Sequence, residues 1–157
     1  MASLRESVRD FLASERIAVA GVSRDPRQIS NAIYRKLKGA GYSVIALNPK
    51  TDRVEGDACY PSLREVPGGV QAVVIATPPE ATLDVARECI ATGVRHVWMH
   101  RSFGQGSVSE EAARLCRENG IRVIAGACPM MYVAPVDFAH ACMRTVLGWV
   151  GRLPSGA

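Results

Sequence analysis

Short apolar runs alternate with amphipathic segments along most of this chain. Five of these runs predict buried strands, at residues 17–22, 43–47, 71–77, 96–99 and 121–125. Apolar positions at helical spacing between and around them predict the helices 3–14, 80–92, 109–119 and 137–150, and one through Ile29, Ile33 and Leu37 that ends at Gly39. The turn-rich segment 54–69 is predicted to hold no strand and only one helical turn, near Leu63.

Strands that alternate with helices of this length imply right-handed crossovers and a parallel sheet. We therefore expect an α/β fold, a Rossmann-like, doubly wound, five-stranded parallel sheet with helices on both faces. The whole chain, 1–157, is expected to be a single domain with its core at 16–129. Ser3 and Glu6 have the spacing of a capping box at the start of the first helix, and Ser30 is a candidate cap for the second.

Composition reduces the number of function classes that the sequence allows. The chain is 48% hydrophobic and 22% charged, which is typical of a soluble globular protein, and no apolar run is long enough to span a membrane. Five irregularly spaced cysteines without an export signal favour a reducing, cytoplasmic location. The net charge of +4 suits an anionic small molecule, and no basic run with interleaved aromatics indicates nucleic acid.

In a doubly wound sheet, ligands bind beyond the carboxyl ends of the strands. The residues there are the candidate binding residues: Gly21, Val22, Ser23, Arg24, Pro26, Ser30 and Asn31 after the first strand, Asn48, Pro49 and Lys50 after the second, and Thr77, Pro78 and Pro79 after the third. Gly21 would allow a phosphate to approach the backbone, and Ser23 would add a hydroxyl donor. His100, Arg101 and Cys128 follow the last two strands.

Two departures from the usual dinucleotide pattern stand out. Gly21 is not followed by the second and third glycines of the G-x-G-x-x-G fingerprint. The second strand ends in Asn48-Pro49-Lys50 instead of the acid that binds the ribose of NAD, and this neutral-to-basic end suits a nucleotide whose ribose is phosphorylated.

These residues resemble the stand-alone CoA-binding domain proteins, whose fold is similar to the CoA-binding domain of the succinyl-CoA synthetase alpha subunit. The resemblance rests on AGVSRDP (20–26), SNAIYRKLKGAGYSVIALNPK (30–50), ACYPSLREVP (58–67), IATPPE (75–80) and the pair Cys128-Pro129. It implies that Gly21–Arg24 and Ser30 take the phosphates of CoA. It also implies that Asn48, Pro49 and Lys50 lie against the adenosine and its 3′-phosphate, and that Thr77, Pro78 and Pro79 border the pantetheine arm.

The expected function is therefore non-catalytic binding of CoA or an acyl-CoA. No nucleophile, base and carboxylate share a motif, so no catalytic residue is predicted, and the spacing of Cys128, His140 and Cys142 matches no metal site. Cys128 is either a reactive thiol facing that of CoA or a small buried residue that closes a turn. One alternative is an NADP-dependent oxidoreductase or redox sensor, with Lys50 and Arg53 on the 2′-phosphate. The other is a protein-interaction module with a vestigial nucleotide site, which forms a homo-oligomer through its last helix.

Overall fold

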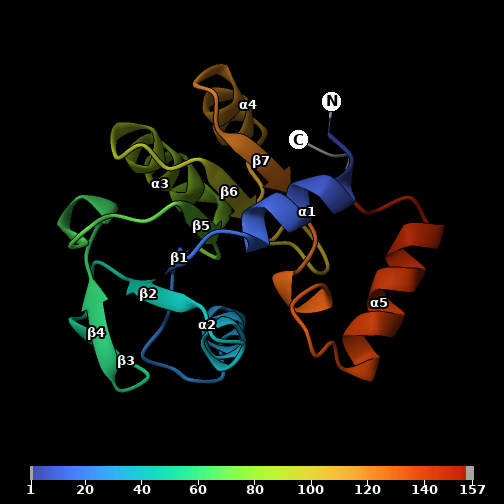
Figure 1. Ribbon diagram of the computed structural model, residues 1–157, viewed down its shortest axis with the longest axis horizontal. Helices are drawn as coiled ribbons and strands as arrows, with labels where there is room; N and C mark the ends of the chain where they lie inside the picture. Colours follow the sequence, from blue (N-terminus) through green and yellow to red (C-terminus); the bar gives the residue numbers. More distant parts are fainter. Residues whose placement is uncertain (1, 155–157) are drawn as a thin grey trace.

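The sheet has seven strands rather than the five expected. The computed structural model describes residues 2–154, and its strands run in the order β3-β4-β2-β1-β5-β6-β7 (Figure 1). They are β1 (Arg16–Ala20), β2 (Ser43–Leu47), β3 (Arg53–Val54), β4 (Asp57–Tyr60), β5 (Ala72–Ile75), β6 (His96–Met99) and β7 (Arg122–Ala125). The five predicted strands are all present and parallel to their neighbours, which confirms the α/β class.

The two additional strands correct the prediction for the segment 54–69. β4 pairs parallel with β2, whereas β3 pairs antiparallel with β4, so the sheet is mixed. The two residues between them, Glu55 and Gly56, have φ of +52° and +79°. Positive φ at both central residues is the geometry of a type I′ turn, which joins the strands of a tight hairpin. The expected helical turn near Leu63 is present as the 3₁₀ turn η1 (Leu63–Glu65).

Helices cover both faces of the sheet, as predicted. Among the described residues the α-helices are α1 (Leu4–Leu12), α2 (Ile29–Gly39), α3 (Pro79–Ala91), α4 (Glu110–Glu118) and α5 (Phe138–Trp149). The side chains of α1, α2 and α5 pack on one face together with the 3₁₀ turn η2 (Pro129–Met131), and those of α3 and α4 pack on the other. Successive strand residues alternate between these layers: Ile17 and Val19 join the first and Ala18 and Ala20 the second.

Hydrogen bonds at the helix starts agree with one prediction and contradict another. Ser3 and Glu6 form the predicted capping box of α1. Ser30 does not cap α2: the N-cap is Gln28, which makes no side-chain capping bond. Ser30 is instead buried in the first turn, because the loop before α2 is closed earlier by Asp25, whose carboxylate accepts the Arg27 N–H at 3.1 Å.

Helix α5 contributes less to the core than its apolar residues suggested. Leu147 is its one buried residue, whereas Phe138 and Trp149 are each 85% exposed and Val146 and Val150 are more than half exposed. In Figure 1, α5 stands at the margin of the molecule, where it packs beside η2. Apolar residues occur on nearly all sides of this helix, so its periodicity could not indicate which side faces inward.

Candidate functional site

The strand order places a topological switch point between β1 and β5. From β1 the chain first moves to β2 on one side, and later returns to β5 on the other side. Ligands of open α/β sheets bind beyond the carboxyl ends of the strands at such a point. The predicted binding residues follow β1, β2 and β5, so they all lie along this carboxyl edge.

The backbone around position 21 leaves room only for glycine. Its φ is +96°, and a Cβ built on it would lie 2.8 Å from the carbonyl oxygen of Ala76. Its N–H donates to the carbonyl of Leu47 at 2.9 Å. Gly21 therefore joins the ends of β1, β2 and β5, and the missing side chain allows the turn to pack against the end of β5.

The turn after Gly21 is held by Asn31, near the start of α2. The Asn31 Oδ1 accepts the Ser23 N–H at 2.8 Å, and its Nδ2 donates to the Ser23 carbonyl at 2.8 Å. The Ser23 Oγ accepts the Asp25 N–H at 3.0 Å. The Ser23 Oγ only accepts in this contact, so its hydroxyl hydrogen remains to donate to a ligand. Within residues 2–154, the N–H groups of Val22 and Arg24 have no hydrogen-bond partner.

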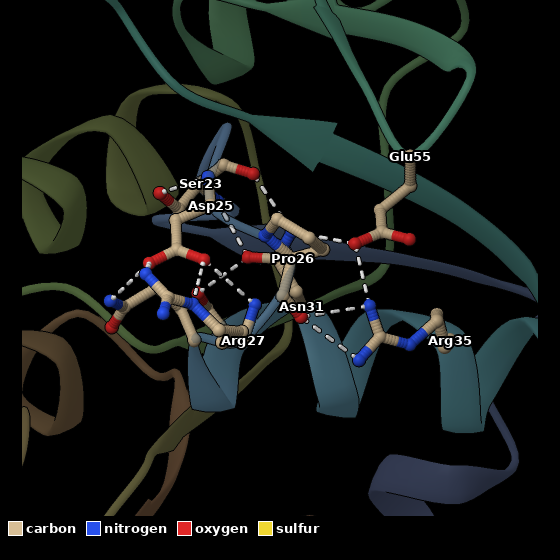
Figure 2. Close-up of polar contacts among 9 residues, drawn as sticks. Ser23, Asp25, Pro26, Arg27, Asn31, Arg35 and Glu55 are labelled. Atoms are coloured by element: carbon tan, nitrogen blue, oxygen red, sulfur yellow. Dashed lines mark hydrogen bonds and ion pairs between the residues drawn. The ribbon is translucent and has the colours of Figure 1, made fainter.

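An acidic residue that the sequence did not reveal completes this network (Figure 2). Glu55, at the tip of the β3–β4 hairpin, accepts a hydrogen bond from Asn31 Nδ2 and one from Arg35 Nη1, each at 2.7 Å. Arg35 also donates to the carbonyl of Pro26 at 3.1 Å. Arg35 therefore neutralises Glu55 and fixes the loop before α2. The pair Glu55-Gly56, between two short stretches of strand-forming residues, was the sequence signal available for this hairpin.

Asn48 connects the second strand to the turn. Its Nδ2 donates to the Val22 carbonyl at 2.9 Å, and its Oδ1 accepts the Lys50 N–H at 2.9 Å. The Asn48 side chain thus sets both the position of the turn and the path of the chain toward Lys50. The structure brings Gly21, Val22 and Asn48 together, as expected from the sheet edge.

The cations of this edge differ in their partners. The side chains of Arg24 and Lys50 are exposed and form no ion pair within the described part of the chain. The Arg53 guanidinium donates to the Gly56 carbonyl at 2.9 Å, inside its own hairpin. Two unpaired positive side chains therefore remain beside the turn.

Thr77, Pro78 and Pro79 form the short connection from β5 to α3. Pro78 is the N-cap of α3 and Pro79 its first residue, where the absent N–H of proline costs no helical bond. The Thr77 carbonyl accepts the Ser107 hydroxyl at 2.5 Å, and the Ser107 N–H donates to the His100 carbonyl at 2.8 Å. The connection is therefore tied to the loop that follows β6.

That loop borders a cavity of about 280 Å³, which we call the distal pocket. The pocket lies beyond the ends of β6 and β7 and is lined by Arg101, Ser102, Phe103, Gly104, Ala127, Leu147 and Arg152. Among residues 2–154, its lining includes two arginines and no acidic side chain. The Arg101 guanidinium lies against Gly126, where a Cβ would be 2.9 Å from Nη2.

His100 and Cys128 lie beside Ser102 and are buried. Burial lowers the pKa of His100 to about 4, so its ring is neutral at pH 7, and its Nε2 lies 3.1 Å from the Ser102 hydroxyl. Burial also raises the pKa of the Cys128 thiol, which keeps it protonated. Cys128 is fully buried, so the structure favours the packed residue over the reactive thiol.

Comparison with known proteins agrees with this geometry. Residues 15–134 match the family described as CoA binding domain, a span that includes every strand and the connections between them. The chain belongs to this CoA-binding domain family. The family is the one that the motifs after β1 and β2 resembled.

Two relatives of this CoA-binding domain chain differ greatly in length. YneT of Bacillus subtilis (strain 168) is 34% identical over 131 residues, which cover 83% of this chain and 89% of YneT. The alpha subunit of the ADP-forming acetate–CoA ligase II of Pyrococcus furiosus is 29% identical over 126 residues. That match covers 75% of this chain but only 27% of the ligase subunit, so most of the ligase has no counterpart here.

A solved structure supports the same fold. A hypothetical protein from Pyrococcus horikoshii OT3 superposes with a TM-score of 0.74 at 29% identity, covering 80% of this chain and 86% of that chain.

No helix within residues 2–154 is both long and apolar enough to cross a membrane. In the same residues, no cluster of three or more His, Cys, Asp or Glu side chains is arranged to hold a metal ion.

Proposed function

We propose that this protein binds CoA or an acyl-CoA at the carboxyl edge of β1, β2 and β5 and carries out no reaction on it. The observation that carries the proposal is the turn at Gly21–Ser23. It is packed on β5, bonded to Asn48 and held by Asn31, at the switch point of a CoA-binding domain.

The chemistry of the edge suits the phosphates of CoA. The unpaired N–H groups of Val22 and Arg24 and the Ser23 hydroxyl are donors for the diphosphate. The free side chains of Arg24 and Lys50 add positive charge, and charge-assisted bonds of this kind contribute on the order of 1.5–3 kcal/mol when partly desolvated. We assign Lys50 to the 3′-phosphate, because it follows β2, where dinucleotide-binding domains hold the ribose.

The remaining predicted residues have supporting roles in this proposal. Pro26 presents its carbonyl to Arg35, and Ser30 packs beside Asn31, its hydroxyl 3.3 Å from Oδ1, so both shape the loop. Pro49 directs the chain toward Lys50. Thr77, Pro78 and Pro79 border the path of the pantetheine arm from β1 toward β6.

Thermal unfolding with a large excess of CoA, dephospho-CoA, NADP or NAD tests the proposal. A ligand at a hundredfold its dissociation constant adds about 2.7 kcal/mol of stability, which raises Tm by several degrees for a chain of this size. We expect CoA to give the largest shift and dephospho-CoA, which lacks the 3′-phosphate, a smaller one. A shift with NADP alone, or with none of the four, contradicts the proposal.

Two variants test the role of Lys50. Lys50→Ala should remove the difference between CoA and dephospho-CoA, because the cation assigned to the 3′-phosphate is lost. Arg5→Ala removes the same charge from an exposed position on α1 and should leave the difference intact. Incubation of acetyl-CoA with the protein, followed by chromatography, should yield no CoA above the level in buffer.

A further inference from the structure

The distal pocket lies where the far end of a bound CoA would arrive. The proposed site for the nucleotide is at β1 and β2, and the strand order continues from β1 through β5 and β6 to β7. Neighbouring strands are about 4.8 Å apart, so the pocket lies two to three strand spacings, roughly 10–14 Å along the sheet edge, from the Gly21 turn. The hydrogen bonds from Ser107 to Thr77 and His100 make the edge continuous between the two places.

The lining of the pocket selects for negative charge. Arg101 and Arg152 both border it, no acidic side chain lines it, and neither arginine forms an ion pair with any residue in 2–154. Ser102 also lines the pocket, and its uncharged hydroxyl lies 3.1 Å from His100 Nε2. His100 is neutral at pH 7, so within the described part of the chain the positive charge at the pocket comes from the two arginines.

Arg101 is held in place for this role. Its backbone N–H donates to the Ala127 carbonyl at 2.9 Å. Its guanidinium occupies the space that the absent side chain of Gly126 leaves open. Gly126 is itself fixed, because its carbonyl accepts the Trp98 Nε1–H at 2.8 Å. The guanidinium is therefore partly ordered before a ligand binds, which lowers the entropy lost on binding.

We propose that the distal pocket binds the terminal carboxylate of a dicarboxylic acyl group carried on CoA, through Arg101 and Arg152. The pocket volume of about 280 Å³ suits a short acyl chain. This inference rests on the proposed CoA site and specifies its ligand as the CoA thioester of a short dicarboxylic acid.

Calorimetric titration with pairs of thioesters of equal carbon number tests the inference. Glutaryl-CoA is compared with pentanoyl-CoA, and malonyl-CoA with propionyl-CoA, so that each pair differs in the terminal carboxylate. We expect the dicarboxylic member of at least one pair to bind about tenfold more tightly, the lower end of the range for charge-assisted bonds because the pocket is open to solvent.

Arginine variants connect this preference to the pocket. Arg152→Gln should remove most of the preference for the dicarboxylic thioester and leave the affinity for CoA and pentanoyl-CoA unchanged. Arg101→Gln should have the same effect, measured on protein that still binds CoA. Arg114→Gln, a change of an exposed arginine on α4, should retain the full preference.

The outcomes separate the two proposals. If no CoA compound binds the wild-type protein, the proposed function fails. If CoA binds but the two thioesters of each pair bind with affinities within twofold of each other, only the inference is overturned. The same holds if the preference for the dicarboxylic thioester remains in Arg152→Gln. Binding of free glutarate as tight as that of glutaryl-CoA, with the same dependence on Arg152, also overturns it, because the pocket would then be a site for free anions.

Discussion

At the β1–β2 end of the sheet, side chains and backbone are tied together, whereas at the β6–β7 end two arginines border a cavity and have no ionic partner among residues 2–154. The first region is organised before any ligand arrives, which favours tight binding of a constant chemical group. In the second region, the two arginines are the groups that we propose bind the variable part of the ligand. This division corresponds to CoA itself, whose nucleotide is constant and whose acyl group changes.

The largest effect is expected at Gly21. Gly21→Ala places a Cβ 2.8 Å from the Ala76 carbonyl oxygen at a φ of +96°, and we expect a loss of about 4 kcal/mol in the free energy of unfolding. Gly41→Ala has a similar φ of +94° but open space around the Cβ, so it should cost only about 1–2 kcal/mol. Urea denaturation measures both. Equal losses would show that the close packing on β5 contributes nothing.

His100 makes the β6–β7 end sensitive to acid. Its pKa is lowered to about 4, so below pH 6.5 the unfolded chain takes up a proton that the folded protein does not. Stability should therefore fall as the pH drops from about 6.5 to 4, by up to about 3 kcal/mol from this residue.

His100→Gln should weaken this pH dependence in denaturation curves recorded from pH 7 to 4. Nuclear magnetic resonance should show the His100 ring titrating near pH 4 in the folded protein. A titration near pH 6.5 would contradict the assignment of a buried, neutral ring.

A moderate effect is expected at Asn31. Asn31→Ala removes its bonds to Ser23 and Glu55, and we expect a loss of about 2 kcal/mol together with weaker CoA binding. Asn31→Asp should be worse, because an oxygen then replaces the Nδ2 that lies 2.7 Å from the Glu55 carboxylate. Asn119→Ala removes one exposed bond to Leu115 and should change stability by less than about 0.5 kcal/mol. Denaturation and CoA titration of all three variants test this order.

The smallest effect is expected on the outer side of α5. Phe138 and Trp149 are each 85% exposed, so Phe138→Ser and Trp149→Ser should each change the free energy of unfolding by less than about 0.5 kcal/mol. Leu147→Ala, on the buried side, should cost about 2–3 kcal/mol. A larger loss at Phe138 or Trp149 that depends on protein concentration would show instead that α5 contacts a second copy of the chain.

Much of the fold could be predicted from the sequence, because strands buried on both faces are nearly continuous apolar runs. The β3–β4 hairpin was missed for a physical reason: strands of two and four residues are too short to show a period, and its turn uses Glu55 where Asn or Asp is common. The cap of α2 was wrongly placed at Ser30, because the sequence did not reveal that Asp25 closes the preceding loop.

The site shows the same limit. The meeting of Gly21 with Asn48 follows from the parallel sheet alone, since both residues come directly after neighbouring strands. The contact of Glu55 with Asn31 and Arg35 depends on how the hairpin packs on α2, and the distal pocket depends on where α5 lies. Such contacts join segments far apart in the chain, which local patterns do not specify.

The indole of Trp98 gives the protein an intrinsic fluorescence signal. It is fully buried and forms a T-shaped pair with the Phe11 ring, with 5.3 Å between the ring centroids. Its Nε1–H donates to the carbonyl of Gly126, and the Arg101 guanidinium lies against that glycine. The other tryptophan, Trp149, is in solvent and can be replaced by phenylalanine. We expect the emission of the remaining indole to change when a ligand occupies the neighbouring cavity, because Gly126 lies between the indole and the Arg101 guanidinium.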